Sequence, residues 1–187
     1  PPPAPREVRG LLDSLQLFPE RTHLVGAYAL GKAQRVIALL REAGYDRTIY
    51  LHGAMESICA LYEAHGVDLG PLEPAMGQSG KLPGEIVICP PSALADRWSR
   101  RFADPITAFA SGWMRVRARA RQRGVELPLV ISDHADWDDL CRTVVETGCS
   151  ELWVTHGQED ALVHWAKTNG VRARPLRMVG YDESEIE

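Results

Sequence analysis

The sequence has 187 residues, of which 45% are hydrophobic and 25% are charged, and its formal net charge is −4. This composition is ordinary for a soluble globular protein, and the length suits one domain or two small lobes. The negative charge excludes a general attraction for nucleic acid, so any such binding must depend on local patches.

Residues 1–104 alternate between strand-like and helix-like patterns. Apolar residues at helical spacing predict the first helix over residues 5–17. Further along, the patterns predict strands over residues 22–29, 47–53 and 85–91, helices over residues 31–46, 54–67 and 92–102, and a Gly- and Pro-rich loop over residues 68–84. This alternation implies an α/β fold with a mainly parallel sheet and flanking helices.

The pattern changes after Pro105. Residues 106–124 are strand-like throughout, and residues 126–137 form a second strand-like segment that ends in a polar turn. The remaining chain predicts helices over residues 136–148 and 158–170 and strands over residues 151–157 and 171–180. We therefore expect two lobes, residues 1–104 and residues 105–187.

The cysteines and the hydropathy pattern indicate the compartment. Four cysteines stand in apolar or helical surroundings and form no CxxC pair: Cys59, Cys89, Cys141 and Cys149. This usage predicts reduced thiols in a cytoplasmic protein. No apolar run approaches the roughly 18 residues of a membrane span, so we expect no membrane partner.

The stretch "GAYALGKAQR", residues 26–35, has the spacing of a phosphate-binding loop, with Gly26, Gly31 and Lys32 in the expected places. Such a loop needs a Ser or Thr hydroxyl for magnesium at the next position, where this sequence has Ala33. The stretch therefore predicts a tight turn from a strand into a helix. A small-molecule domain of Rossmann type is an alternative interpretation of this part of the chain.

Two histidines follow buried strands. His134 comes after an apolar run in "VISDHADW", and His156 follows another in "LWVTHGQED". Ligands and catalytic groups collect at the carboxyl edge of open α/β sheets, so we expect both rings to open onto one cleft. Asp133 and Asp136 flank His134, and a neighbouring carboxylate can hold an imidazole in one tautomer. The alternative is a pair of ordinary loop histidines.

Two histidines do not complete a zinc site, which needs four protein ligands, or three and a water molecule. The sequence has no HxHxDH motif and no other H-x-H pair. A complete hydrolytic metal centre therefore cannot come from this chain alone.

Arginines recur with a period of two in "MRVRARARQR". On one strand they would share a face, and a planar guanidinium group can bond two phosphate oxygens at once. This pattern predicts a ladder that binds the nucleic-acid backbone, formed by Arg115, Arg117, Arg119 and Arg121. The alternative is a solvated strand whose charges discourage edge pairing.

Three stretches together resemble the β-CASP branch of the metallo-β-lactamase-fold nucleases: "YALGKAQRV", "SDHAD" and "VTHGQED". They stand in the family's order, about 100 residues from the first to the second and 22 from His134 to His156. The flanking "SDHADW" and "ASGWM" are most similar to bacterial ligase-associated DNA exonucleases, which are related to messenger-RNA 3′-end processing factors.

The resemblance implies a β-CASP lobe over residues 1–104 and a lobe over residues 105–187 that completes a metallo-β-lactamase αββα fold. It implies a hydrolase, the C-terminal portion of a zinc-dependent phosphodiesterase that acts as a DNA exonuclease in repair or processing. His134, with Asp133 and Asp136, would be catalytic, and His134 is the candidate general acid. His156 would bind one of two zinc ions.

The family's HxHxDH region is missing, so we expect this chain alone to be inactive, with no metal site or an incomplete one. The expected partners are DNA, with RNA as a second substrate class, and a DNA ligase or helicase. The alternative is a non-catalytic nucleic-acid-binding module or accessory subunit derived from such a nuclease.

Overall fold

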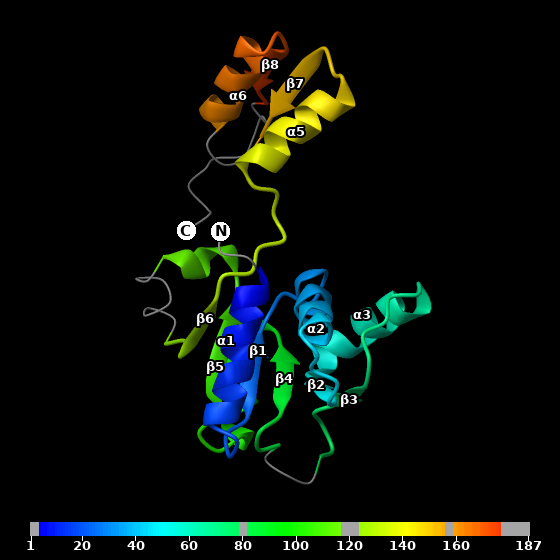
Figure 1. Cartoon of the computed structure of the whole chain (residues 1–187), viewed down its shortest axis with the longest axis vertical. Helices are drawn as coiled ribbons and strands as arrows, with labels where there is room; N and C mark the ends of the chain where they lie inside the picture. The colour runs from blue at the N-terminus through cyan, green and yellow to red at the C-terminus, as the bar shows by residue number, and fades with distance from the viewer. Residues whose placement is uncertain (1–3, 79–81, 117–123, 156–158, 177–187) are drawn as a thin grey trace. The chain divides into compact units, whose positions relative to one another are not determined.

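The computed structural model describes residues 4–78, 82–116, 124–155 and 159–176. The chain divides into two compact units, Pro1–His134 and Ala135–Glu187, which are described separately (Figure 1). In the described residues, no helix has both the length and the apolar character needed to cross a membrane.

The first unit is built on a sheet of six strands in the order β3-β2-β4-β1-β5-β6. Every pairing in this sheet is parallel, which confirms the predicted α/β fold with a mainly parallel sheet. The strands are β1 (His23–Gly26), β2 (Ile49–Leu51), β3 (Leu72–Pro74), β4 (Ile86–Cys89), β5 (Ile106–Ala110) and β6 (Leu127–Leu129). β3 lies inside the predicted loop, because a three-residue edge strand with mostly exposed side chains gives little sequence signal.

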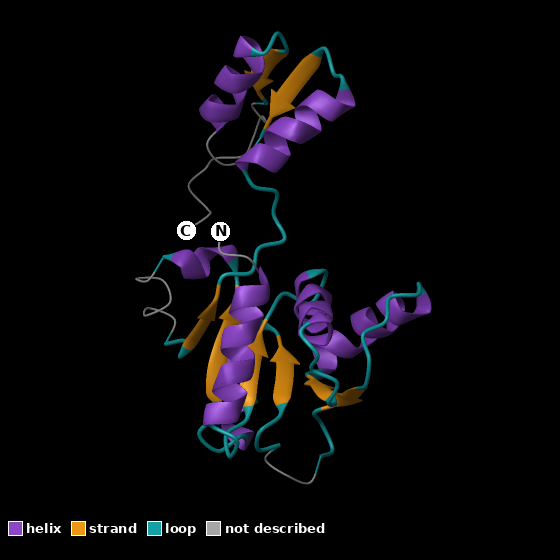
Figure 2. Ribbon diagram, viewed as in Figure 1, coloured by secondary structure: helices purple, strands orange, loops and turns teal. Residues whose placement is uncertain are grey.

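Three α-helices pack on one face of this sheet and are seen with it in Figure 2. They are α1 (Ala4–Leu17), α2 (Lys32–Glu42) and α3 (Gly53–Ala64). In α1, Val8, Leu11 and Leu15 are buried at spacings of three and four residues, which places them on one side of the helix. Full burial of each such side chain stabilises the fold by about 1.5–3 kcal/mol.

The opposite face of the sheet is covered by short 3₁₀ helices, η1 (Pro91–Leu94), η2 (Ser99–Arg101) and η3 (Gly112–Arg115), and the segments around them. η1 and η2 replace the helix predicted over residues 92–102. The Asp96 carboxylate accepts the N–H of Arg97, and the Asp96 carbonyl accepts the Ser99 hydroxyl. Local bonds of this kind compete with an α-helix, which explains the interruption.

The boundary between the two units falls at His134 and Ala135, whereas the sequence pattern predicts a lobe boundary at residues 104 and 105. β5 pairs with β1, and β6 pairs with β5, so both strands belong to the first sheet. Four of the five residues of β5 are buried, which reflects its place inside the sheet.

The second unit contains α5 (Trp137–Thr147), β7 (Glu151–Val154), α6 (Glu159–Thr168) and β8 (Arg172–Pro175). The two strands are parallel, and the four elements match the predicted order of helix and strand. Their small core is formed by Val154, Val163, Ala166 and Ala173.

Candidate functional site

The candidate site is the segment of residues 131–134, which follows β6 at the carboxyl edge of the first sheet. Ile131 is buried and donates its N–H to the Leu129 carbonyl at 2.9 Å. Because all the strands of the sheet are parallel, the turn that leads from β1 into α2 lies at the same edge. Ligands of open α/β sheets bind at this edge.

Lys32, the first residue of α2, contacts this segment directly. Its side chain is buried, and Nζ lies 3.2 Å from the Ile131 carbonyl oxygen and 2.5 Å from Asp133 Oδ1. The sequence pattern did not predict this role, because it associated Lys32 with the spacing of a phosphate loop and with the β-CASP-like stretch "YALGKAQRV", and with no partner. A lysine in the first turn of a helix, where the helix dipole disfavours a cation, was the available signal.

Asp133 is therefore paired with Lys32. Partial burial raises the pKa of the Asp133 carboxyl group. The hydrogen bond and the charge of Lys32 lower this pKa by more, so it lies below its ordinary value. His134 Nε2 lies 3.9 Å from Asp133 Oδ1, which is longer than a hydrogen bond. The Asp133 carboxylate thus does not fix the tautomer of His134 through a hydrogen bond in this conformation.

His134 presents its ring to solvent. Its side chain is 89% exposed, and its backbone N–H donates to Ser132 Oγ at 3.2 Å. A Cβ added to Gly112 would lie 3.3 Å from the Ser132 side chain, so the segment after β5 packs closely here. Ile131 at the start of the segment is buried, whereas the ring of His134 is exposed, so His134 can meet a substrate from outside.

Asp136 belongs to the second unit, where it is the N-cap of α5. Its Oδ1 accepts the backbone N–H of Asp139 at 3.0 Å. Such a cap stabilises a helix by about 1 kcal/mol, so this carboxylate has a clear structural role.

The predicted arginine strand is wrong where the structure describes it. β5 ends at Ala110, and Arg115 is an exposed residue at the end of η3. The chain leaves the strand because Ser111 Oγ accepts the N–H of Trp113 and begins the 3₁₀ helix. The other members of the predicted ladder lie outside the described residues: Arg117, Arg119 and Arg121.

The predicted metal ligand, His156, also lies outside the described residues, so its distance from His134 stays a prediction. Within residues 4–78, 82–116, 124–155 and 159–176, no three His, Cys, Asp or Glu side chains gather in a way that could hold a metal ion.

The turn of residues 26–31 has structural partners for its polar groups. The Gly31 N–H donates to Gln34 Oε1 at 2.8 Å, and Gln34 Nε2 donates to the Ala29 carbonyl at 3.0 Å. Gly26 packs against Leu94, where an added Cβ would lie 2.6 Å from Leu94 Cδ1. These contacts support the prediction of a tight strand-to-helix turn, because a bound phosphate would need the N–H that Gln34 accepts.

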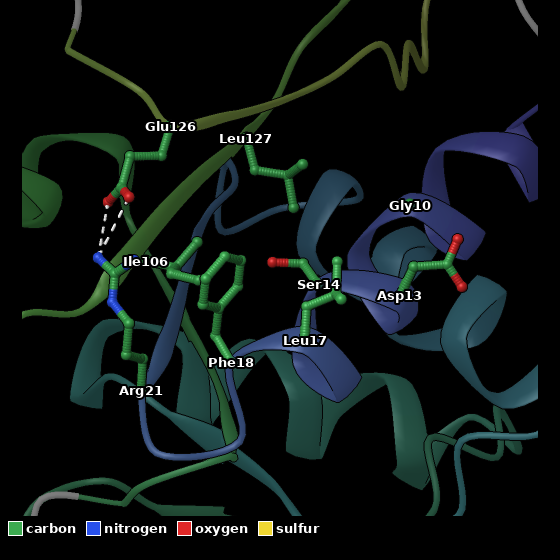
Figure 3. A pocket seen from close by; sticks show the side chains of 9 residues that line it. All are labelled: Gly10, Asp13, Ser14, Leu17, Phe18, Arg21, Ile106, Glu126 and Leu127. Carbon is green, nitrogen blue, oxygen red and sulfur yellow. Dashed lines mark hydrogen bonds and ion pairs between the residues drawn. The ribbon is translucent and has the colours of Figure 1, made fainter.

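An open pocket of about 330 Å³ lies between α1 and the amino-terminal ends of β5 and β6, at the opposite edge of the sheet (Figure 3). Arg21 enters it and pairs with Glu126 and Asp104, each at 3.1 Å. These pairs occupy the guanidinium group, and the pocket is separate from the 131–134 segment.

No family model matches the sequence. The chain is similar to a protein of Opitutus terrae named "Probable DNA ligase", with 26% identity over 146 residues. The matched residues are 78% of this chain, and the chain spans 14% of the length of that relative.

Proposed function

We propose that the chain is the C-terminal portion of a zinc-dependent phosphodiesterase that acts as a DNA exonuclease in DNA repair or processing. The observation that carries the proposal is the placement of His134, which is exposed beside the pair of buried Lys32 and partly exposed Asp133, at the carboxyl edge of a parallel sheet where ligands bind. The similarity to a protein named as a probable DNA ligase supports a role in DNA processing. The proposed reaction, the hydrolysis of a phosphodiester bond, follows from the resemblance to the β-CASP nucleases.

In this reaction, water forms a new bond to phosphorus while the bond to the leaving oxygen breaks. His134 donates the proton that the leaving oxygen takes up, and general-acid catalysis of this kind contributes about 10²–10⁴-fold to a rate. Two zinc ions, when bound, would activate the water and stabilise charge on the phosphate. His156 would contribute one ligand, and residues outside this sequence would supply the HxHxDH set.

The test uses the full-length protein with zinc, end-labelled single-stranded DNA and a matched RNA. His134→Ala should lower turnover by about 100-fold or more, as expected for a lost general acid, and should leave the zinc content nearly unchanged. His156→Ala should lower the zinc content as well. His164→Ala is the control, because His164 is an exposed residue of α6.

Equal turnover in the wild-type protein and in His134→Ala would contradict the proposed role of His134. A wild-type protein that binds DNA and cleaves neither substrate would instead favour the binding module or accessory subunit. Faster cleavage of the RNA would change the substrate class.

A further inference from the structure

We propose that Lys32 is a positioning residue that holds the 131–134 segment at the edge of the sheet and thereby fixes the place of His134. This inference rests on the proposed function for its effect on catalysis. Its structural part, the anchoring of the segment by Lys32, can be tested without any activity.

The burial of Lys32 makes this contact a strong one. Its side chain is only 4% exposed, and removing an ammonium group from water is costly unless it is paired and hydrogen-bonded. The Asp133 carboxylate supplies the opposite charge, and the Ile131 carbonyl supplies a second acceptor. Both acceptors belong to the 131–134 segment, so its position and the burial of Lys32 depend on each other.

The place of Lys32 in the helix also points to this role. As the first residue of α2, it lies at the end where the helix dipole opposes positive charge. Neither helix propensity nor the dipole selects a buried lysine there. The burial of the lysine charge is instead compensated by the 131–134 segment, whose Ile131 carbonyl lies 99 residues further along the chain.

Other contacts hold the chain just before this segment. The Val130 N–H donates to Glu7 Oε2 at 2.7 Å, and the Leu129 carbonyl accepts the N–H of Ser111 at 3.0 Å. These bonds fix the end of β6, but they do not reach Asp133. The Lys32–Asp133 pair is thus the side-chain contact nearest to His134 that reaches back to α2.

A fixed backbone at residue 133 matters because the ring of His134 is itself exposed. A catalytic group must be held within about 0.5 Å of its productive place by residues that touch it or its backbone. Lys32 contacts Ile131 and Asp133, and the structure gives it no contact with the ring of His134. It acts through Asp133 and the backbone that carries His134.

The structural test is amide hydrogen exchange of residues 131–134 in the 187-residue chain. Lys32→Met keeps the length of the side chain and removes the charge, and it should speed exchange in this segment at least tenfold. Asp133→Asn should have a similar effect, and it tests the same pair at a partly exposed position if Lys32→Met fails to fold. Lys167→Met is the control, because Lys167 is an exposed residue of α6.

The kinetic test uses the full-length protein. Lys32→Met should lower kcat by about 10–100-fold, the usual loss when an orienting partner is removed, with little change in KM or zinc content. In a His134→Ala background, the same substitution should have almost no further effect, because a positioning residue acts through the group that it positions.

The outcomes separate the two proposals. Unchanged exchange in Lys32→Met and Asp133→Asn would overturn the anchoring, whatever the activity. An active wild-type enzyme in which Lys32→Met keeps full kcat, or loses as much activity without His134 as with it, would overturn the positioning role. Faster exchange together with a wild-type protein that lacks nuclease activity would support the anchoring and overturn the proposed function.

Discussion

The Gln34 side chain folds back over the first turn of α2 and accepts the backbone N–H of Gly31 at 2.8 Å. Its amide nitrogen donates to the Ala29 carbonyl at 3.0 Å and contacts Cys59 Sγ at 3.3 Å. One buried side chain therefore joins the turn after β1, the start of α2 and a residue of α3. The turn that shares the spacing of a phosphate loop is stabilised from inside the protein.

Substitution of Gln34 should destabilise the first unit. Gln34→Ala removes the bond to the Gly31 N–H and leaves polar groups without partners, at a cost of about 1–3 kcal/mol in the free energy of unfolding. Urea unfolding of the 187-residue chain measures this change. Gln16→Ala, at an exposed position of α1, should change the stability little. An equal effect of the two substitutions would contradict the role given to Gln34.

A side chain at position 26 should destabilise the first unit. In Gly26→Ala the new Cβ would meet Leu94 Cδ1 at 2.6 Å, and overpacking of this kind costs about 1–3 kcal/mol. Gly10→Ala is the control, because nothing lies within 4 Å of its added Cβ in the middle of α1. That change should stabilise the chain by about 0.5–1 kcal/mol.

The same unfolding experiment tests the cause of the effect at Gly26. Adding Leu94→Ala should recover part of the loss, since it removes the atoms that clash. A Gly26→Ala variant that is no less stable than the wild-type protein would contradict the close packing of β1 against η1.

The stability of the chain should fall at alkaline pH. Burial raises the pKa of the Cys89 thiol from 9.0 to about 12. Above pH about 9 the unfolded chain loses this proton while the folded chain keeps it, so folding becomes less favourable as the pH rises. One such group lowers the stability by at most about 1.4 kcal/mol per pH unit.

Urea unfolding at pH 7 and pH 10 measures this dependence. The loss between the two values should be smaller in Cys89→Ala than in the wild-type protein, because the variant lacks the group that titrates. Cys149→Ala, at a less buried position, is the control and should keep the wild-type dependence. Identical losses in all three proteins would contradict the burial of an unpaired thiol at position 89.

Trp113 should contribute to DNA binding if the proposed function holds. Trp113 is 60% exposed, and it follows Gly112, which lies against Ser132 in the candidate site. Stacking of a base on an aromatic side chain contributes about 1–3 kcal/mol, so Trp113→Ala in the full-length protein should weaken single-stranded DNA binding by that amount. Phe18→Ala, near the opposite edge of the sheet, should leave the affinity unchanged. Equal affinities for both variants and the wild-type protein would exclude stacking at Trp113.

The arginines of "MRVRARARQR" should affect the salt dependence of the same binding. Replacing Arg117 and Arg119 with alanine should reduce the slope of log affinity against log salt by about one unit or less for each phosphate that the variant no longer neutralises. The measurement is a titration of single-stranded DNA across a salt series. If both slope and affinity stay the same, these arginines form a solvated surface.

Local sequence patterns were sufficient for much of the fold. The alternation of buried strands and amphipathic helices predicted the parallel sheet, because side-chain periodicity depends on neighbours only a few residues away. The ends of α5 were also local features. Asp136 caps its start, and Gly148 ends it in the left-handed conformation, with φ of 58°. The sequence also predicted that His134 follows a strand, and in the structure it comes five residues after the end of β6 at Leu129.

Packing between distant segments determined the rest. Adjacency in the sequence associated Asp133 with His134, but the tertiary structure pairs Asp133 with Lys32 across about 100 residues of chain. The strand predicted through Arg115 stops at Ala110, where the chain turns into η3 beside Ser132. The sequence by itself thus determined which segments become strands and helices, because that depends on local periodicity. Only the tertiary structure decided which charges meet, because that depends on the strand order, which brings the ends of β1 and β6 to the same edge of one sheet.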